Sequence, residues 1–225
     1  MKVILKTMFI AVLFSLFAGP FSVLAAEFPD LPGDHWARRE ILEMQTLNVI
    51  AGAKDGNFYP EAPVTRAQFA TIITKSLKLP IQTSGKSRFT DVQKGYWATG
   101  YIEAAASAGF INGYQGKFRP ADNISRQEMA VIIMKISGKY GYAADGSTDV
   151  LIKYKDGNDV APWAASAFNG SLRFAYMNGV NEIETVTNSV YKTPWFKREL
   201  KPGANATRAE AAYALYKLLV KTGLV

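Results

Sequence analysis

Three arginines occur in the same local sequence, and their guanidinium groups are well suited to bind an anion. Each follows a hydroxyl residue, precedes a Glu or Gln by two positions and heads an apolar run: Arg66, Arg126 and Arg208. A hydroxyl residue three positions before Glu or Gln is a capping box, which predicts a helix N-terminus at each copy. A cation at the first helical position opposes the helix dipole, so capping does not explain the arginines.

Two roles for these arginines are open. A guanidinium beside the amides of a helix N-terminus makes a receptor for a carboxylate. Alternatively, each arginine forms a salt bridge to an aspartate that recurs once per copy: Asp30, Asp91 and Asp156. An aspartate repeated in this way is typical of a cap or a loop brace. Glycoside hydrolysis needs one defined pair of carboxyl groups, and no pair is distinguished among three equivalent sets.

Aromatic residues recur in the same register. A tryptophan follows each aspartate by six or seven positions: Trp36, Trp97 and Trp163. These side chains are suited either to core packing or to the role of a platform for the apolar face of a sugar. In the second copy, the segment Asn112-Gly113-Tyr114 predicts a tight loop or a minimal hairpin.

These residues belong to a pattern with a period of about 60 residues. In each copy the sequence predicts a first helix from the tryptophan and a second helix after the capping box. Asn48 and Gly109 are suited to end the first helices of copies one and two. One such helix pair cannot bury its apolar face alone, so the repeats should pack as one body. We expect repeats at residues 28–80, 89–141 and 154–225, the last with an insertion at about 181–199.

The N-terminal residues 1–25 are typical of a secretory signal peptide. Lys2 and Lys6 precede an apolar run that ends in small residues, which suits cleavage after Ala25 or Ala26. An uncleaved membrane anchor is the alternative, because a run of about 19 residues can cross a bilayer. With either outcome we expect the remainder of the chain to be exported.

The composition excludes several kinds of chemistry. The 225 residues include no cysteine, which rules out disulfides, thiol nucleophiles and Cys-ligated zinc. The single histidine, His35, makes a His-based metal site or catalytic triad improbable, and we assign it no role. The net charge of +7 favours anionic partners, yet it is dispersed without an arginine-rich segment, which argues against nucleic acid. We expect no catalytic residue, metal or cofactor.

The repeated landmarks together resemble the S-layer homology domain, in three tandem copies. These landmarks are Phe-x-Asp before Trp-Ala, an Asn-Gly-Tyr turn, Phe-x-Pro and Thr-Arg-Ala-Glu before an apolar helix. The resemblance implies a mainly α, pseudo-threefold, prism-like body. It also implies non-enzymatic cell-wall anchoring, through inter-repeat grooves that bind an anionic, often pyruvylated secondary cell-wall polymer or a peptidoglycan-linked glycan.

The resemblance assigns the main anion contact to the arginine of the motif. We therefore expect Arg66, Arg126 and Arg208 to contact the ligand, and the tryptophans, the aspartates and the Asn112-Gly113-Tyr114 turn to shape the groove walls. Copy one departs from the pattern with Gln68 in place of the acid. Copy three departs most, since it has the insertion and lacks the short turn. Two alternatives are a protein-interaction module that contacts S-layer proteins during assembly and, less favoured, a secreted wall-glycan hydrolase.

Overall fold

The computed structural model describes residues 27–180 and 198–225. The described residues form six α-helices, two short 3-10 helices and isolated β-bridges, with no β-sheet, which confirms the mainly α class. The elements are α1 (Arg38–Thr46), α2 (Arg66–Ser76), α3 (Thr99–Ser107), α4 (Arg126–Lys139), η1 (Leu151–Lys153), η2 (Gly157–Asp159), α5 (Pro162–Arg173) and α6 (Arg208–Lys221).

Local sequence signals set the helix starts. Helices α2, α4 and α6 each begin at a complete capping box, with the N-cap residues Thr65, Ser125 and Thr207. In each box the N-cap hydroxyl accepts the N3 amide while the N3 side chain accepts the N-cap amide, as the sequence predicts. Helix α5 begins at Pro162, and α1 and α3 begin two residues after their tryptophans.

Left-handed backbone ends the three outer helices. Asn48 and Gly109, the predicted stops of α1 and α3, have φ values of 57° and 78°. Ala175, the equivalent residue after α5, has a φ of 56° although its Cβ makes this conformation unfavourable. Because the same turn is kept without a glycine, the packing of the following residues must hold it there.

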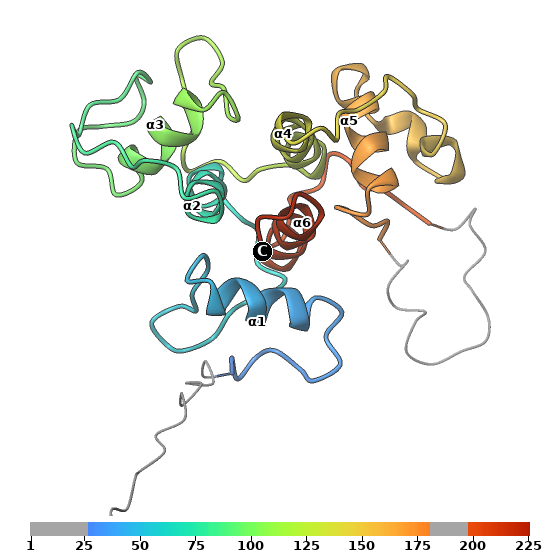
Figure 1. Ribbon diagram of the computed structural model, residues 1–225, viewed down its shortest axis with the longest axis horizontal. Coiled ribbons are helices and arrows are strands. Elements are labelled where there is room, and N and C mark those ends of the chain that lie inside the picture. The colour runs from blue at the N-terminus through green and yellow to red at the C-terminus, as the bar shows by residue number, and fades with distance from the viewer. Residues whose placement is uncertain (1–26, 181–197) are drawn as a thin grey trace, which may run out of the picture.

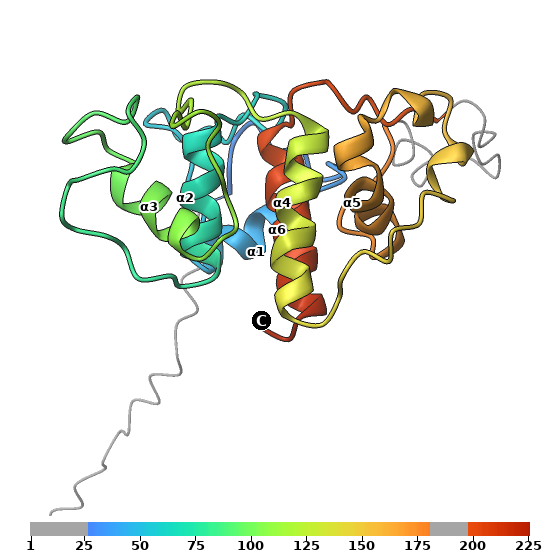
Figure 2. The ribbon, with the colours of Figure 1, turned by 90° about the horizontal axis from the view of Figure 1, so that it is seen from above.

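The helices pair across repeat boundaries. Helices α2, α4 and α6 are seen end-on at the centre of Figure 1, and α1, α3 and α5 lie outside them. The central helices stand side by side in Figure 2. Helix α3 packs on α2, α5 packs on α4, and α1 packs on α6. Each outer helix therefore covers the central helix of the preceding repeat, and the first repeat closes on the third.

A closed cycle of backbone hydrogen bonds ties the three repeats together just before the central helices. The amide of Val64 donates to Ala206 O (3.0 Å), that of Ala206 to Ile124 O (2.8 Å), and that of Ile124 to Val64 O (3.1 Å). All three side chains are buried. The repeats therefore pack as one body, as expected, while the prism-like outline stays a prediction.

Two expectations concern residues outside the described part of the chain. The signal peptide, residues 1–25, lies there, and so does most of the insertion, at residues 181–197. Within residues 27–180 and 198–225, no helix is long and apolar enough to cross a membrane.

Candidate functional site

The amides at the start of each central helix are not free to bind an anion. In α2, the amides of Arg66 and Ala67 donate to Asp122 O (2.8 Å) and Pro120 O (3.1 Å) of the next repeat. The third amide donates to the N-cap hydroxyl of Thr65. Helices α4 and α6 repeat this arrangement with carbonyls of the third and first repeats. The idea that free helix amides complete an anion receptor is therefore wrong, because inter-repeat bonds occupy them.

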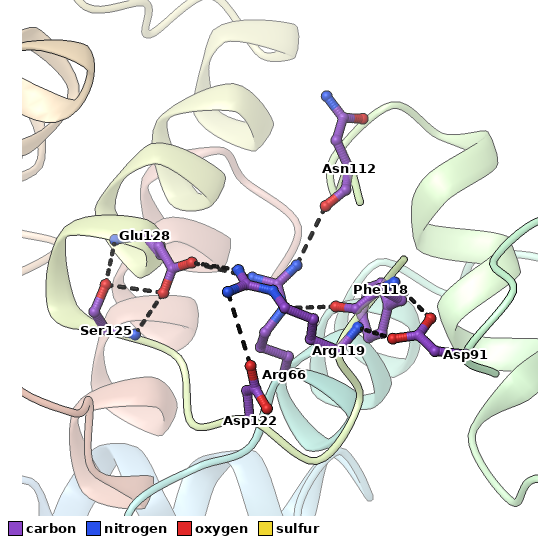
Figure 3. Close-up of polar contacts among 8 residues, drawn as sticks. All are labelled: Arg66, Asp91, Asn112, Phe118, Arg119, Asp122, Ser125 and Glu128. Carbon is purple, nitrogen blue, oxygen red and sulfur yellow. Dashed lines mark hydrogen bonds and ion pairs between the residues drawn. The ribbon is translucent and has the colours of Figure 1, made fainter. Parts of the chain in front are cut away.

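Arg66 is buried in the junction between repeats one and two, at 7% exposure. Figure 3 shows its guanidinium between the two repeats: Nε donates to Phe118 O (2.8 Å) and Nη2 to Asn112 O (3.2 Å). Its Nη1 donates to Glu128 Oε1 (3.3 Å). Burial lowers the pKa of Arg66, and the charge of Glu128 opposes this effect. The salt-bridge partner is thus a glutamate of the next capping box rather than an aspartate.

Arg126 repeats this geometry between repeats two and three, at 3% exposure. Its Nε and Nη2 donate to Leu200 O and Asn178 O, both at 2.7 Å, and its Nη1 forms an ion pair with Glu210. Burial lowers its pKa to about 10, so the side chain remains a cation at neutral pH. Arg66 and Arg126 both hold adjacent repeats together.

Arg208 differs from the other two arginines. Its Nε donates to Phe58 O (2.8 Å) and its Nη2 to Ala51 O (3.0 Å), and its guanidinium lies 4.6 Å from the centre of the Phe58 ring. It forms no ion pair with any carboxylate of the described residues, and it is partly exposed. The junction between repeats three and one thus keeps the carbonyl contacts and lacks the glutamate.

The three aspartates brace loops. Asp91 accepts the amides of Phe118 and Arg119, both at 2.7 Å (Figure 3). Asp30 and Asp156 accept the equivalent pairs of amides in the other repeats. In each repeat the second amide belongs to a residue with positive φ directly before a proline. The aspartates therefore fix the carbonyls that receive the arginines, and a direct ligand contact by them stays a prediction.

The tryptophans occupy two environments. Trp97 and Trp163 are 57% and 61% exposed, so they lie outside the core. Trp36 is partly buried and lies 5.4 Å from the Tyr213 ring, measured between ring centres. Tyr114 is 72% exposed on a two-residue hairpin turn, whose closing amide–carbonyl pair joins it to Lys117.

Gly113 has a steric requirement in this hairpin. A Cβ atom at this position would lie 2.4 Å from Lys117 O and 2.6 Å from the Phe89 ring. The predicted minimal hairpin is present, with its turn at Gln115–Gly116 rather than at Asn112–Gly113. The backbone of Asn112 contributes the carbonyl that accepts from Arg66.

A cavity of about 600 Å³ lies where the first and third repeats meet. The aromatic residues in its wall are Trp36, Tyr154 and Tyr213, and the charged residues are Glu40, Arg198 and Lys217. Lys217 Nζ lies 3.3 Å from Glu40 Oε1 and 5.2 Å from the centre of the Tyr213 ring. Asn178, whose carbonyl accepts from Arg126, also lines it. The cavity thus combines flat apolar surfaces with two cations and one anion.

Sequence reasoning found Trp36 but missed most other residues of this cavity. The sequence analysis assigned no role to Tyr213 and Lys217, although their spacing of four residues places them on one face of α6. Glu40 is 5% exposed, which the sequence alone gave no reason to expect. Among the described residues, no group of three or more His, Asp or Glu side chains is arranged to hold a metal ion.

Comparison with known proteins agrees with the first two copies of the repeat pattern. The model of the S-layer homology domain matches residues 27–70 and 88–130. The chain is 32% identical over 194 residues to an amylopullulanase of Thermoanaerobacterium thermosulfurigenes, a match that covers 84% of this chain and 9% of the relative. It is 29% identical over 218 residues to the S-layer protein sap of Bacillus anthracis, which covers 95% and 26%.

A cellulosome-anchoring protein of Acetivibrio thermocellus is 36% identical over 141 residues, a match that covers 60% of this chain and 31% of the relative. The chain therefore spans at most about a third of the length of each of these three relatives. The matched segments contain the landmarks Asp30, Trp36, Asp91, Trp97 and Arg126. The chain carries S-layer homology domains in its first two repeats.

Proposed function

We propose that this chain is a non-enzymatic, exported module that attaches to the cell surface by binding an anionic cell-wall glycan. The cavity between the first and third repeats is the observation that carries this proposal. Its tryptophan and two tyrosines offer flat faces to sugar rings, and Lys217 and Arg198 offer positive charge. Pockets with aromatic walls and a few polar groups are typical of small-ligand sites.

The relatives support the same proposal. One is named for cellulosome anchoring and another for the S-layer, and their matches cover 60% and 95% of this chain. The matched amylopullulanase shares only 9% of its length with this chain, so its name gives no reason to assign glycan cleavage here. We propose a secondary cell-wall polymer, pyruvylated or otherwise acidic, as the ligand, and the cell wall as the location.

The aspartates argue against the hydrolase alternative. Each carboxylate accepts two backbone amides, which is the role of a loop brace rather than of a proton donor or nucleophile. The protein-interaction alternative has a better basis, because Trp97 and Trp163 are largely exposed and offer apolar surface to a partner such as an S-layer protein.

Sedimentation with purified wall sacculi tests the proposal. We expect the protein to bind intact sacculi and to lose binding when the secondary polymer is stripped from them. Trp36→Ala should weaken binding about tenfold, which corresponds to 1.4 kcal/mol. Tyr140→Ala is the matched control, because Tyr140 is a 39% exposed aromatic residue outside the cavity. Undiminished binding to stripped sacculi would overturn the secondary polymer as the ligand.

A further inference from the structure

The cavity proposed for the glycan contains one carboxylate, which lies among aromatic and cationic side chains. Glu40, on α1, is the only acidic residue among the described residues that line this cavity, and it is 5% exposed. Its Oε1 lies 3.3 Å from Nζ of Lys217, which belongs to α6. Lys217 is the only polar partner of Glu40 among the described residues. The site proposed for an anionic polymer therefore holds a buried negative charge of its own.

Glu40 retains the capacity to accept further hydrogen bonds. A carboxylate has about four acceptor positions, and the single ammonium contact uses only part of them. Buried carboxylates need several donors, because the loss of hydration is otherwise costly. The side chain of Glu40 is 7% exposed, whereas that of Lys217 is 35% exposed, so bulk water hydrates the acid poorly. Donor groups of a ligand in the cavity would supply the missing hydrogen bonds.

The acid is particular to this one of the three junctions between repeats. Each central helix has a lysine nine positions after its first residue: Lys75, Lys135 and Lys217. The position four residues after the tryptophan of the outer helix is Glu40 in the first repeat and is uncharged, as Tyr101 and Ala167, in the other two. Because α1 packs on α6, Glu40 meets the lysine of the third repeat. At the other two junctions the equivalent position offers its lysine no negative charge.

The Glu40–Lys217 ion pair suits hydroxyl groups and disfavours a second carboxylate. A sugar ring that packs on an aromatic face such as that of Trp36 leaves its hydroxyl groups at its edge. One such hydroxyl can donate to Glu40 in a charge-assisted hydrogen bond and accept a hydrogen bond from Lys217. A ligand carboxylate in the same place would meet the like charge of Glu40, while the charge of Lys217 is already neutralised.

We propose that Glu40 determines which sugar occupies the cavity: it selects an uncharged, hydroxyl-bearing residue of the glycan and excludes a residue that carries a carboxylate. The inference rests on the proposed function, in which this cavity binds a cell-wall glycan. It also specifies the role of Lys217, which donates to a hydroxyl group of the selected sugar rather than to an acidic group of the polymer. The acidic groups of the polymer then lie on residues outside this part of the cavity.

The test compares two forms of the same ligand. Oligosaccharides of the secondary polymer are released from sacculi, and in one portion the carboxyl groups are reduced to alcohols. Calorimetry gives the ratio of the affinities for the acidic and the reduced forms. Glu40→Gln frees Lys217 and should shift this ratio about tenfold towards the acidic form. Lys217→Met leaves the charge of Glu40 uncompensated and should shift the ratio in the opposite direction. Glu43→Gln removes the same charge from an exposed position of α1 and should leave the ratio unchanged.

A selective and a purely structural role of the ion pair give different results. If the pair only holds α1 on α6, both variants lower the two affinities by the same factor, and the ratio stays at the value of the parent protein. An unchanged ratio in either variant, or shifts of the same sign in both, overturns selection by Glu40 and leaves glycan attachment standing if sacculi still bind. Opposite shifts support the selection. Failure of the unaltered protein to bind sacculi overturns the proposed function itself.

Discussion

Replacing each junction arginine by methionine should destabilise the protein by unequal amounts. Arg126→Met removes a nearly fully buried cation whose three contacts are Leu200 O, Asn178 O and Glu210. Methionine keeps most of the side-chain volume, so the loss is chiefly electrostatic. Removal of one partner from a buried ion pair costs about 3–5 kcal/mol, because the other charge is left uncompensated. Glu210 is 18% exposed and keeps its capping bond, so we expect about 3 kcal/mol.

Arg208→Met should cost less, because no carboxylate is left without its partner. It removes two hydrogen bonds to carbonyls at a partly exposed junction, where water can replace the lost donors. We expect about 1 kcal/mol in total, roughly half the usual net value of two hydrogen bonds, because water replaces part of what is lost. The difference of about 2 kcal/mol between the two variants should shift the urea midpoint by about 1 M, for a slope near 2 kcal/mol/M.

Urea unfolding, monitored by the helical circular dichroism signal, gives the free energy of unfolding of both variants under identical conditions. A second variant, Arg126→Met with Glu210→Gln, controls for the stranded charge and should recover part of the loss. Equal losses for Arg126→Met and Arg208→Met, or a larger loss for Arg208→Met, would refute the claim that the junctions differ in their ion pairs.

Two further predictions concern the loop before the second central helix. Burial raises the pKa of Asp91, but the amides of Phe118 and its neighbour outweigh this effect and the net pKa is lowered. Its contribution to stability is therefore complete above its unfolded pKa of about 3.9 and is lost as the pH falls through the lower folded value. Asp91→Asn should flatten the acid limb of the stability profile in a pH series of urea titrations, and an unchanged limb would contradict this. Gly113→Ala should destabilise by about 2 kcal/mol, since its Cβ would lie 2.4 Å from Lys117 O, and a midpoint equal to that of the parent would show that the hairpin adjusts freely.

Local signals were the predictable part of the fold. The capping boxes, the proline at the start of α5 and the stops at Asn48 and Gly109 each depend on residues within one turn of the backbone. The docking of the helices was not predictable in this way. The repeats resemble one another, so an outer helix finds a similar apolar face on its own central helix or on that of the preceding repeat. Sequence periodicity cannot distinguish those two arrangements.

In the candidate site too, features set by local sequence were predictable, and contacts between repeats were not. The sequence identified the arginines as positions that capping does not explain, and it noted that Gln68 breaks the pattern. It could not identify the glutamate of the next repeat as the arginine's partner, because that contact joins residues 62 or more positions apart. The sequence also led us to expect that the first amides of the central helices are free. Their acceptors lie in the following repeat, which local sequence does not reveal.

The pairing of α1 with α6 brings together helices of the first and third repeats, which no direct connecting segment joins. One connecting segment joins α2 to α3 (residues 77–98) and another joins α4 to α5 (residues 140–161), so the chain itself links the members of those two pairs. Within the described residues, α1 and α6 are instead joined only by packing, the Glu40–Lys217 ion pair and the contact of Trp36 with Tyr213. The third repeat is also held on the first by the bond of the Val64 amide to Ala206 O and by the amides of Arg208 and Ala209, so separating α1 from α6 would not by itself release the two repeats from each other. Residues of both helices line the cavity proposed for the glycan, so a bound glycan would contact α1 and α6 together and oppose their separation.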